Sequence, residues 1–428
     1  MFHRDKPLFS RPVLAVIIVA STLAVWLLNL TDPKTVLEQP NIRSWQTSSH
    51  IPVYWVAQDT WSGGDKVEMT IVFHGESQYS ALTKATWELL TGPTLPLSTA
   101  TINQRLTPLA AKAESHFAAQ QQMLQISFSN QPQYLSATMK VLDTWLNQTQ
   151  FKYSALQNRA RNNVPDSVSQ QLLMQLWPEY DISDTTNSPL TTDTLEQHLA
   201  NIKQSVSHII VAGALTESAK SQLQTALDQL TQTMAYRATH SSLTNASEPQ
   251  TKVLGNHDLQ ALYGAIALTP LQSVTDWLAL QIWAKDSLER QKQQLHSNIG
   301  QWQLHLSPWQ PYVTWQLQAA QSVLAADAST PAPDSSWIVP NTLPSYQDSK
   351  AFSDLKAQLL AQLANLSQNP TWWSAIGSRV AYPDSPLDLA TFAEHYSEAA
   401  NSFTMSQYQA AIDRLLVISS RQEVLVKL

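Results

Sequence analysis

Cysteine is absent from the 428-residue chain. The protein can therefore form no disulfide bond, and it has no thiol that could act as a nucleophile. The absence fits an oxidising compartment, because a chain without cysteine cannot form wrong disulfides there.

Charge is also scarce, since Asp, Glu, Lys and Arg make up 14% of the residues and the net charge is -7. A nucleic-acid partner needs a basic surface that neutralises phosphates, so no nucleic acid is expected as a partner. The sequence has no G-x-S-x-G nucleophile elbow, and Gly63-Gly64 lacks the strand-to-helix pattern of a phosphate loop. Serine, cysteine and nucleotide chemistry are therefore unsupported.

The overall composition is that of a folded globular protein, with 43% hydrophobic residues and 15 Trp. The length is sufficient to bury two sizeable cores. At the N-terminus, Arg4, Lys6 and Arg11 precede an uncharged apolar run at 12–30. As a helix this run is about 28 Å long, which is one membrane span.

We therefore predict a cytoplasmic basic flank at 1–11, a transmembrane anchor at 12–30 and a polar tether at 31–50. Everything after the anchor is then expected in the periplasm. A cleaved signal peptide is the alternative, with its small-residue site at Thr22-Leu23-Ala24. We favour the retained anchor because cleavage at that site leaves an apolar terminus.

The hydrophobic pattern predicts a first half at 51–235 and a second at 251–428, separated by a Ser-, Thr- and Asn-rich linker at 236–250. In the first half we expect strands at 51–58, 66–75 and 206–215, a hairpin at 112–129, and helices at 80–91, 98–110 (capped by Ser98 or Thr99), 132–146, 151–163, 192–204 (capped near Thr192 or Asp193) and 217–230. In the second half we expect strands at 259–268 and 422–428, a hairpin at 300–320, helices at 271–288 and 402–416, and a long exposed loop at 325–347. Both halves end with a Thr-capped helix followed by an apolar strand, which indicates an internal duplication. The predicted fold class is α+β, with two similar halves, each a mostly antiparallel sheet packed with helices.

Several segments resemble the insulinase or pitrilysin-type zinc metallopeptidases, which include the mitochondrial processing peptidases. They are IPVYWVAQ, KVEMTIVFHGES, SALTKATWELL, YLSATMKVLDTWLNQTQFKYSALQNRARNNV and TLEQHLANIKQSVSHIIVAGAL, and the resemblance extends over residues 51–428. It implies a processing-peptidase-like domain of two similar halves that pairs with a second such domain around an extended peptide. Together with the basic flank, it implies a single-pass protein of a bacterial inner membrane.

The catalytic signature of the family is H-x-x-E-H, with two His as zinc ligands, a Glu as general base and a distal Glu as third ligand. Three ligands leave one position of the zinc open for water, whose pKa the metal lowers. In this chain Lys84 and Glu88 occupy the places of the two His, and Trp87 occupies the place of the base. The segment FKYSALQNRARNN, which matches the helix of the distal Glu, has no acidic residue, and its Arg159 and Arg161 would repel a dication. Where active members carry an Arg and a Tyr around Gly-Leu, only Gly300 is kept. The resemblance therefore implies zinc as the family cofactor, but this chain lacks the ligands, and we expect no cofactor and no catalytic residue.

Other histidines give weak metal signals. His395, with Glu394 and Glu398, offers residue types that can bind a metal, one helical turn apart. A solvated helix face explains the pattern better. His74 and Glu76 lie at the end of a strand, near the vacated metal position, by which we mean Lys84, Trp87 and Glu88. A surface loop is the ordinary interpretation of such a pair.

Tryptophan is the remaining signal. Five residues are candidates for contact with a peptide or a partner, although burial in the core is the competing interpretation: Trp302, Trp309, Trp315, Trp372 and Trp373.

Three hypotheses follow from the sequence. The preferred one is a non-catalytic, membrane-anchored subunit that forms a heterodimer with an active zinc-bearing homologue and completes its peptide-binding chamber. The second is an active peptidase with a rearranged metal site built from His74, Glu76 and Glu88. The third is a stand-alone scaffold or peptide-binding protein.

Overall fold

The computed structural model describes residues 37–75, 81–118, 121–162, 167–179, 190–238, 243–255, 259–294, 300–318, 347–383 and 385–427. Among these residues no helix has the length and apolar character to cross a membrane. The predicted anchor at 12–30 and most of the predicted loop at 325–347 lie outside the described residues.

The first half contains a six-stranded sheet in the spatial order β1-β2-β6-β3-β5-β4. Its strands are β1 (Asn41–Gln46), β2 (Pro52–Ala57), β3 (Lys66–His74), β4 (Lys112–Ala118), β5 (Gln121–Ser129) and β6 (Val206–Gly213). Only β2 and β6 run parallel, and the other neighbours are antiparallel. Every residue of β6 is buried, as expected for an apolar central strand that is covered on both faces. The strands and the hairpin predicted for this half are confirmed.

The predicted tether at 31–50 needs a correction, because residues 41–46 form β1, which pairs with β2. The segment is mostly polar because β1 is an edge strand with no buried residue. An alternating apolar pattern is therefore missing from it.

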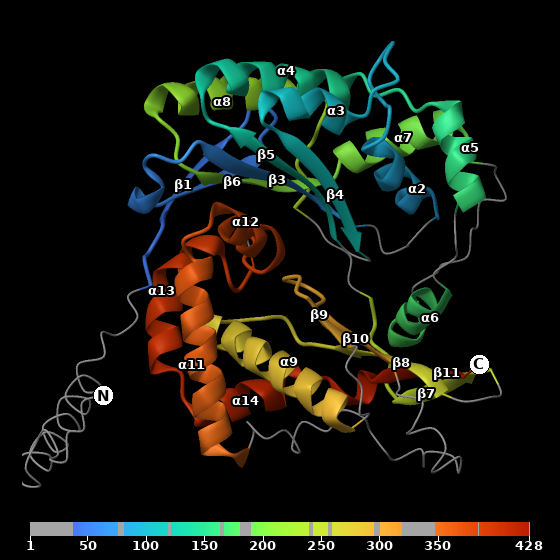
Figure 1. Ribbon diagram of the computed structural model, residues 1–428, viewed down its shortest axis with the longest axis vertical. Helices are drawn as coiled ribbons and strands as arrows, with labels where there is room; N and C mark the ends of the chain where they lie inside the picture. The colour runs from blue at the N-terminus through green and yellow to red at the C-terminus, as the bar shows by residue number, and fades with distance from the viewer. Residues whose placement is uncertain are drawn as a thin grey trace, which may run out of the picture.

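Helices cover one face of the first sheet: α2 (Ala81–Leu90), α3 (Ile102–Leu106), α4 (Pro132–Asn147), α5 (Tyr153–Asn162), α7 (Thr192–Lys203) and α8 (Glu217–Leu230) (Figure 1). Helix α3 begins later than predicted, because Thr101 rather than Ser98 or Thr99 is its N-cap, in a capping box with Gln104. Similarly, Thr191 rather than Thr192 or Asp193 caps α7.

The second half contains a five-stranded sheet in the order β7-β11-β8-β10-β9. Its strands are β7 (Gln250–Leu254), β8 (Leu259–Ala267), β9 (Gly300–His305), β10 (Tyr312–Gln318) and β11 (Gln422–Lys427), and its helices are α9 (Val274–Gln294), α11 (Ser349–Leu366), α12 (Pro370–Arg379), α13 (Leu389–Ser402) and α14 (Met405–Leu415). The sequence analysis predicted β8 to β11, α9 and α14, and it interpreted 394–398, which lie in α13, as a helix face, but it missed β7, α11 and α12.

The two sheets have the same topology once β1 is set aside. In both, the first and last strands of the half pair in parallel, and the last strand then pairs antiparallel with the second. The closing helices α7 and α14 both begin with a Thr capping box, at Thr191 and Thr404. The predicted repetition of two similar halves is therefore confirmed.

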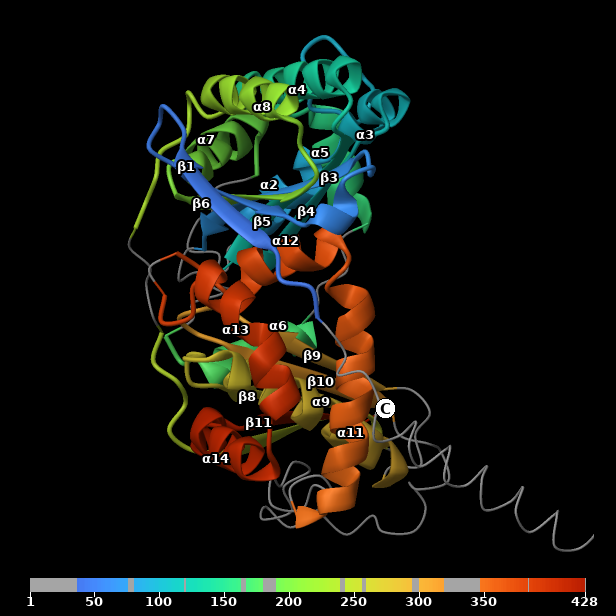
Figure 2. The ribbon, with the colours of Figure 1, turned by 90° about the vertical axis from the view of Figure 1, so that its left-hand side faces the viewer.

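The halves exchange one helix each. Helix α6 (Ser167–Leu176) belongs by sequence to the first half but packs on β8 and β11 of the second sheet. Helix α12 belongs to the second half but packs on β3 and β6 of the first sheet. Figures 1 and 2 show α12 directly beneath the first sheet, between the two halves. Because β3 and β6 correspond to β8 and β11, the exchange is reciprocal.

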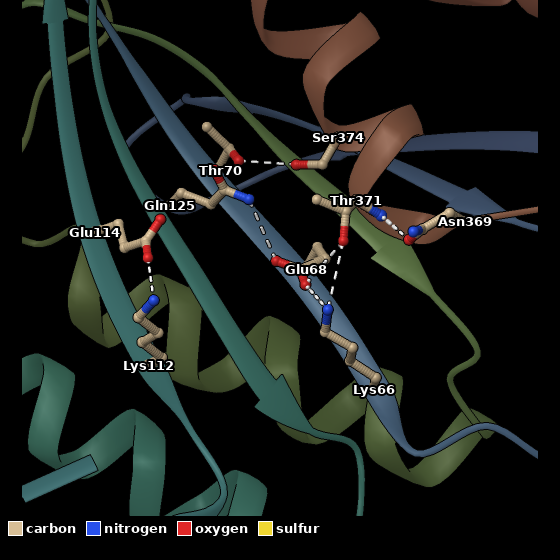
Figure 3. Close-up of polar contacts among 9 residues, drawn as sticks. All are labelled: Lys66, Glu68, Thr70, Lys112, Glu114, Gln125, Asn369, Thr371 and Ser374. Carbon is tan, nitrogen blue, oxygen red and sulfur yellow. Dashed lines mark hydrogen bonds and ion pairs between the residues drawn. The ribbon is translucent and has the colours of Figure 1, made fainter. Parts of the chain in front are cut away.

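Polar contacts hold α12 to the first sheet (Figure 3). Thr70 and Ser374 share a hydrogen bond of 2.8 Å between their hydroxyls. The buried Glu68 carboxylate forms an ion pair of 2.6 Å with Lys66 and accepts a hydrogen bond of 3.2 Å from Thr371 Oγ1. Since Glu68 is buried, these partners compensate the loss of its hydration.

Candidate functional site

Helix α2 carries Lys84, Trp87 and Glu88, the three residues that the sequence analysis matched to the family's metal-site positions. Residues Ala85, Trp87, Leu89 and Leu90 pack into the core of the first half. Lys84 and Glu88 lie one turn apart, with side chains 20% and 37% exposed.

Glu88 is held by cations from two helices. Arg159 Nε on α5 donates to Glu88 Oε2 at 2.7 Å, and Lys84 Nζ lies 3.9 Å from Oε1. The Arg159 side chain is only 12% exposed, so its charge is fixed in a sheltered position. The resemblance matches this segment to the helix of the distal zinc ligand, and in this chain the segment supplies a cation. The guanidinium neutralises the one carboxylate of the vacated position and repels a divalent metal.

Trp87 stands in the place of the general base and is 1% exposed. Its Nε1 donates to Gln122 Oε1 of β5 at 2.6 Å, and its ring lies 5.5 Å from that of Phe73. An indole N–H is a donor only, so Trp87 cannot accept a proton from water. The residue is part of the packing of α2 against the sheet.

The other candidate ligands do not gather. His74 Nε2 is hydrogen-bonded to the Arg237 carbonyl at 2.8 Å, and Glu76 lies outside the described residues. No group of three His, Asp or Glu able to hold a metal occurs in the described part of the chain. Glu394, His395 and Glu398 are exposed on α13, which agrees with a solvated helix face.

The structure has two cavities that the sequence analysis did not describe: one is lined by the second half alone, and the other by residues of both halves. The apolar cavity, of about 560 Å³, is lined by α9, β9, α11 and α12 through residues that include Trp277, Trp302, Leu359, Trp372, Ile376 and Arg379. The polar cavity, of about 300 Å³, is lined by residues that include Ser115, His116, Phe117, Leu304, His305 and Arg379. Both volumes are in the usual range of ligand sites.

The polar cavity joins the edge strands of the two sheets, since His116 lies on β4 and His305 on β9. It is also close to the vacated metal position, because Ser115 Oγ on β4 donates to the Trp87 carbonyl at 3.1 Å. The cavity and α2 are therefore connected through one strand.

Arg379, the last residue of α12, sets the electrostatics between the cavities. Arg379 is exposed, but partial desolvation by the cavity walls lowers the pKa of its guanidinium. Burial, and then the charge of Arg379, lowers the pKa of His305 to about 4; the same two causes lower the pKa of His116, against the opposing effect of Glu114. Both imidazoles are therefore predominantly neutral at pH 7, and the guanidinium is the permanent charge of the polar cavity.

The five Trp candidates divide into three groups. Trp302 and Trp372 are partly buried and line the apolar cavity. Trp315 and Trp373 are 2% and 0% exposed and belong to the core, so for these two the competing interpretation of core packing holds. Trp309 is partly buried and lines neither cavity among the described residues.

No family model and no curated protein matches the chain. Solved structures with the same fold include the inactive domain of an M16 peptidase from Pseudomonas fluorescens, with a TM-score of 0.62 and 13% identity over 90% of this chain and 97% of that chain. A protease from Helicobacter pylori matches with a TM-score of 0.66 and 11% identity over 91% of this chain and 100% of that chain. The periplasmic protease PqqL from Escherichia coli matches with a TM-score of 0.61 and 10% identity over 90% of this chain and 45% of that chain.

The chain therefore has the α+β fold of the M16 peptidases, the insulinase-type proteins that its sequence resembles. The segment that the resemblance matches to the zinc motif forms a helix, α2, and carries Lys84, Trp87 and Glu88. The residues at the vacated metal position do not fit a zinc ion, because its one carboxylate is bound to Arg159.

Proposed function

We propose that this protein is a non-catalytic M16-like subunit that binds polypeptide between its two halves. The ion pair between Arg159 and Glu88 carries the proposal, because a fixed cation is bound to the carboxylate of the helix that the resemblance matches to the zinc motif. The buried Trp87 supports it as well, since it leaves no group to deprotonate a water molecule.

A partner subunit follows from the same observations. A chamber for proteolysis needs a zinc-bearing domain, and this chain lacks the ligands for one. We infer that a homologous active zinc peptidase pairs with it as a heterodimer. Two comparisons support the inference: one neighbour is the inactive domain of an M16 peptidase, and this chain corresponds to 45% of the PqqL chain.

The location is part of the proposal. The apolar run at 12–30 and the basic flank favour a retained anchor in a bacterial inner membrane, with the soluble part in the periplasm. The absence of cysteine and the likeness to a periplasmic protease agree with this location.

The first test measures zinc content and cleavage of an unfolded polypeptide, such as reduced casein, by the full chain purified in detergent. We expect no stoichiometric zinc and no cleavage from the lone chain, and both from a complex with a co-purified homologue. Stoichiometric zinc and cleavage by the lone chain would overturn the proposal in favour of a rearranged site.

A variant with restored ligands tests whether α2 and α5 are the correct location of the lost metal site. Substituting Lys84→His, Trp87→Glu, Glu88→His and Arg159→Glu places a family-type ligand set on α2 and α5. Because Arg159 already reaches Glu88 at 2.7 Å, a carboxylate on α5 should approach the new ligands. We expect this variant to gain zinc, measured by mass spectrometry of metals, whereas Arg159→Glu alone should not.

A further inference from the structure

Arg379 forms part of the walls of both cavities. Within the described residues its guanidinium has no hydrogen bond and no ion pair, and Tyr382 is the one group that opposes the lowering of its pKa. A guanidinium presents five donors in a planar fork that matches a carboxylate. Arg379 is exposed to solvent where it borders the two cavities. An arginine in this position, with no partner among the described residues, has the chemistry of an anion receptor.

The described residues around the two cavities supply no carboxylate to Arg379. Among the described residues that line the two cavities, Arg379 and Lys285 are cations, and none is an Asp or Glu. The neighbouring carboxylate is that of Glu114, 3.8 Å from His116 Nε2, and it is paired with Lys112 (Figure 3). The two cavities are therefore a positive region within a chain of net charge -7.

The apolar cavity, which Arg379 also borders, determines which chemical group can be attached to the bound anion. Three of its walls are the rings of Trp277, Trp302 and Trp372, and the rings of Trp277 and Trp372 lie 6.1 Å apart. Such a cavity releases free energy when a large apolar group displaces its water. The two cavities together suit a carboxylate that is attached to a bulky apolar group.

We propose that Arg379 binds the C-terminal carboxylate of a polypeptide whose last side chain is large and apolar and enters the apolar cavity. A peptide suits the site better than a fatty acid, because the polar cavity lies between the edge strands β4 and β9. The outward main-chain groups of an edge strand can bond to a peptide main chain, which an alkyl chain lacks. This inference rests on the proposed function in taking a polypeptide as the ligand, and it names the end of the chain that is recognised.

The experiment titrates the full chain in detergent and EDTA with acetyl-Ala-Ala-Ala-Phe, followed by tryptophan fluorescence and calorimetry. We expect the free acid to bind at least about tenfold more tightly than the C-terminal amide. Arg379→Gln should remove this preference, while Arg105→Gln, an exposed arginine on α3, should keep it. Ala375→Leu, which fills part of the apolar cavity, should weaken the Phe-ending peptide more than one that ends in Ala.

Asp384 is a nearby carboxylate in the sequence that lies outside the described residues, so the titration is repeated with Asp384→Asn. Arg379-dependent binding in either background supports the proposal, and its absence from both overturns it. Equal binding of acid and amide also overturns it, as does Arg379-dependent binding of dodecanoate without binding of the peptide. EDTA removes any zinc, so a chain that proved to be a zinc enzyme would refute the proposed function and leave this result unaffected.

Discussion

At the scale of single residues, the two cations around Glu88 are expected to differ in their contribution to stability. Arg159 is sheltered and donates at 2.7 Å, whereas Lys84 lies at 3.9 Å. Because Glu88 is 37% exposed, water screens both pairs. We expect Arg159→Met to lower the free energy of unfolding by about 1 kcal/mol.

Lys84→Met is the matched control, and its loss should be less than half as large. Urea unfolding at low and at moderate salt measures both, and the effect of Arg159→Met should shrink as salt is added. A variant as stable as the wild type would show that the ion pair is not a fixed feature of the vacated position.

The sequence alone identified the residues on α2 that replace the zinc motif, but not the residues that contact them in the fold. Lys84, Trp87 and Glu88 could be placed by matching one helix, because the three residues are local. The pairing of Arg159 with Glu88 spans 71 residues and depends on how α5 packs beside α2. Nothing in the sequence marked Arg379 as a binding residue. An arginine in the last turn of a helix is common, because its charge interacts favourably with the helix dipole.

At the scale of elements, the contact between α12 and β6 contains a buried histidine. His208 Nε2 lies 2.9 Å from the Gly377 carbonyl of α12, and Nδ1 lies 2.9 Å from Ser207 Oγ. The helix can approach this closely because a Cβ on Gly377 would lie 2.8 Å from Ile210 Cδ1. Burial lowers the pKa of His208 from 6.5 to about 4, against a smaller opposing effect of the bond to Gly377.

This shift predicts a dependence of stability on pH. The unfolded chain protonates His208 near pH 6.5, while the folded chain keeps it neutral down to about pH 4. Stability is therefore fully present above pH 6.5 and falls as the pH is lowered towards 4, by at most about 3 kcal/mol from this residue. His305, whose pKa is also lowered to about 4, adds a dependence of the same sign.

Urea unfolding at pH 7.5, 6.0 and 5.0 measures the slope. We expect His208→Asn to be less stable at pH 7.5 but to lose less stability on acidification than the wild type. A slope that His208→Asn leaves unchanged would mean that the buried imidazole does not remain neutral at this contact.

The sequence could not predict which sheet α12 packs against. An amphipathic pattern shows that a helix has a buried face, but it does not say which sheet covers that face. Helices α6 and α12 each pack on the sheet that belongs by sequence to the other half. Most strands, in contrast, were predictable, since their apolar runs are local and their turns are marked by Gly, Asn and Asp. The edge strands β1 and β7 were missed because neither has a buried residue.

At the scale of the whole molecule, the exchange of α6 and α12 makes the halves dependent on each other. Without the second half, Val56, Ile210 and Ala212 lose the cover that α12 and its neighbours provide. Without the first half, Ala265 and Val424 of the second sheet lose the cover of Leu172, Leu176 and Trp177. Large apolar faces left in water favour aggregation over folding.

We therefore expect fragments 37–238 and 243–427 to bind a hydrophobic dye and to aggregate when produced separately. When they are produced together, each should supply the helix that the other lacks, giving a one-to-one complex with a native near-ultraviolet circular dichroism spectrum. Leu176→Asp in the first fragment is the control: Leu176 is buried against the second sheet, so the charge should block assembly. If either fragment alone unfolds cooperatively, the halves are separate domains and the exchange is not what holds the polar cavity between them in place.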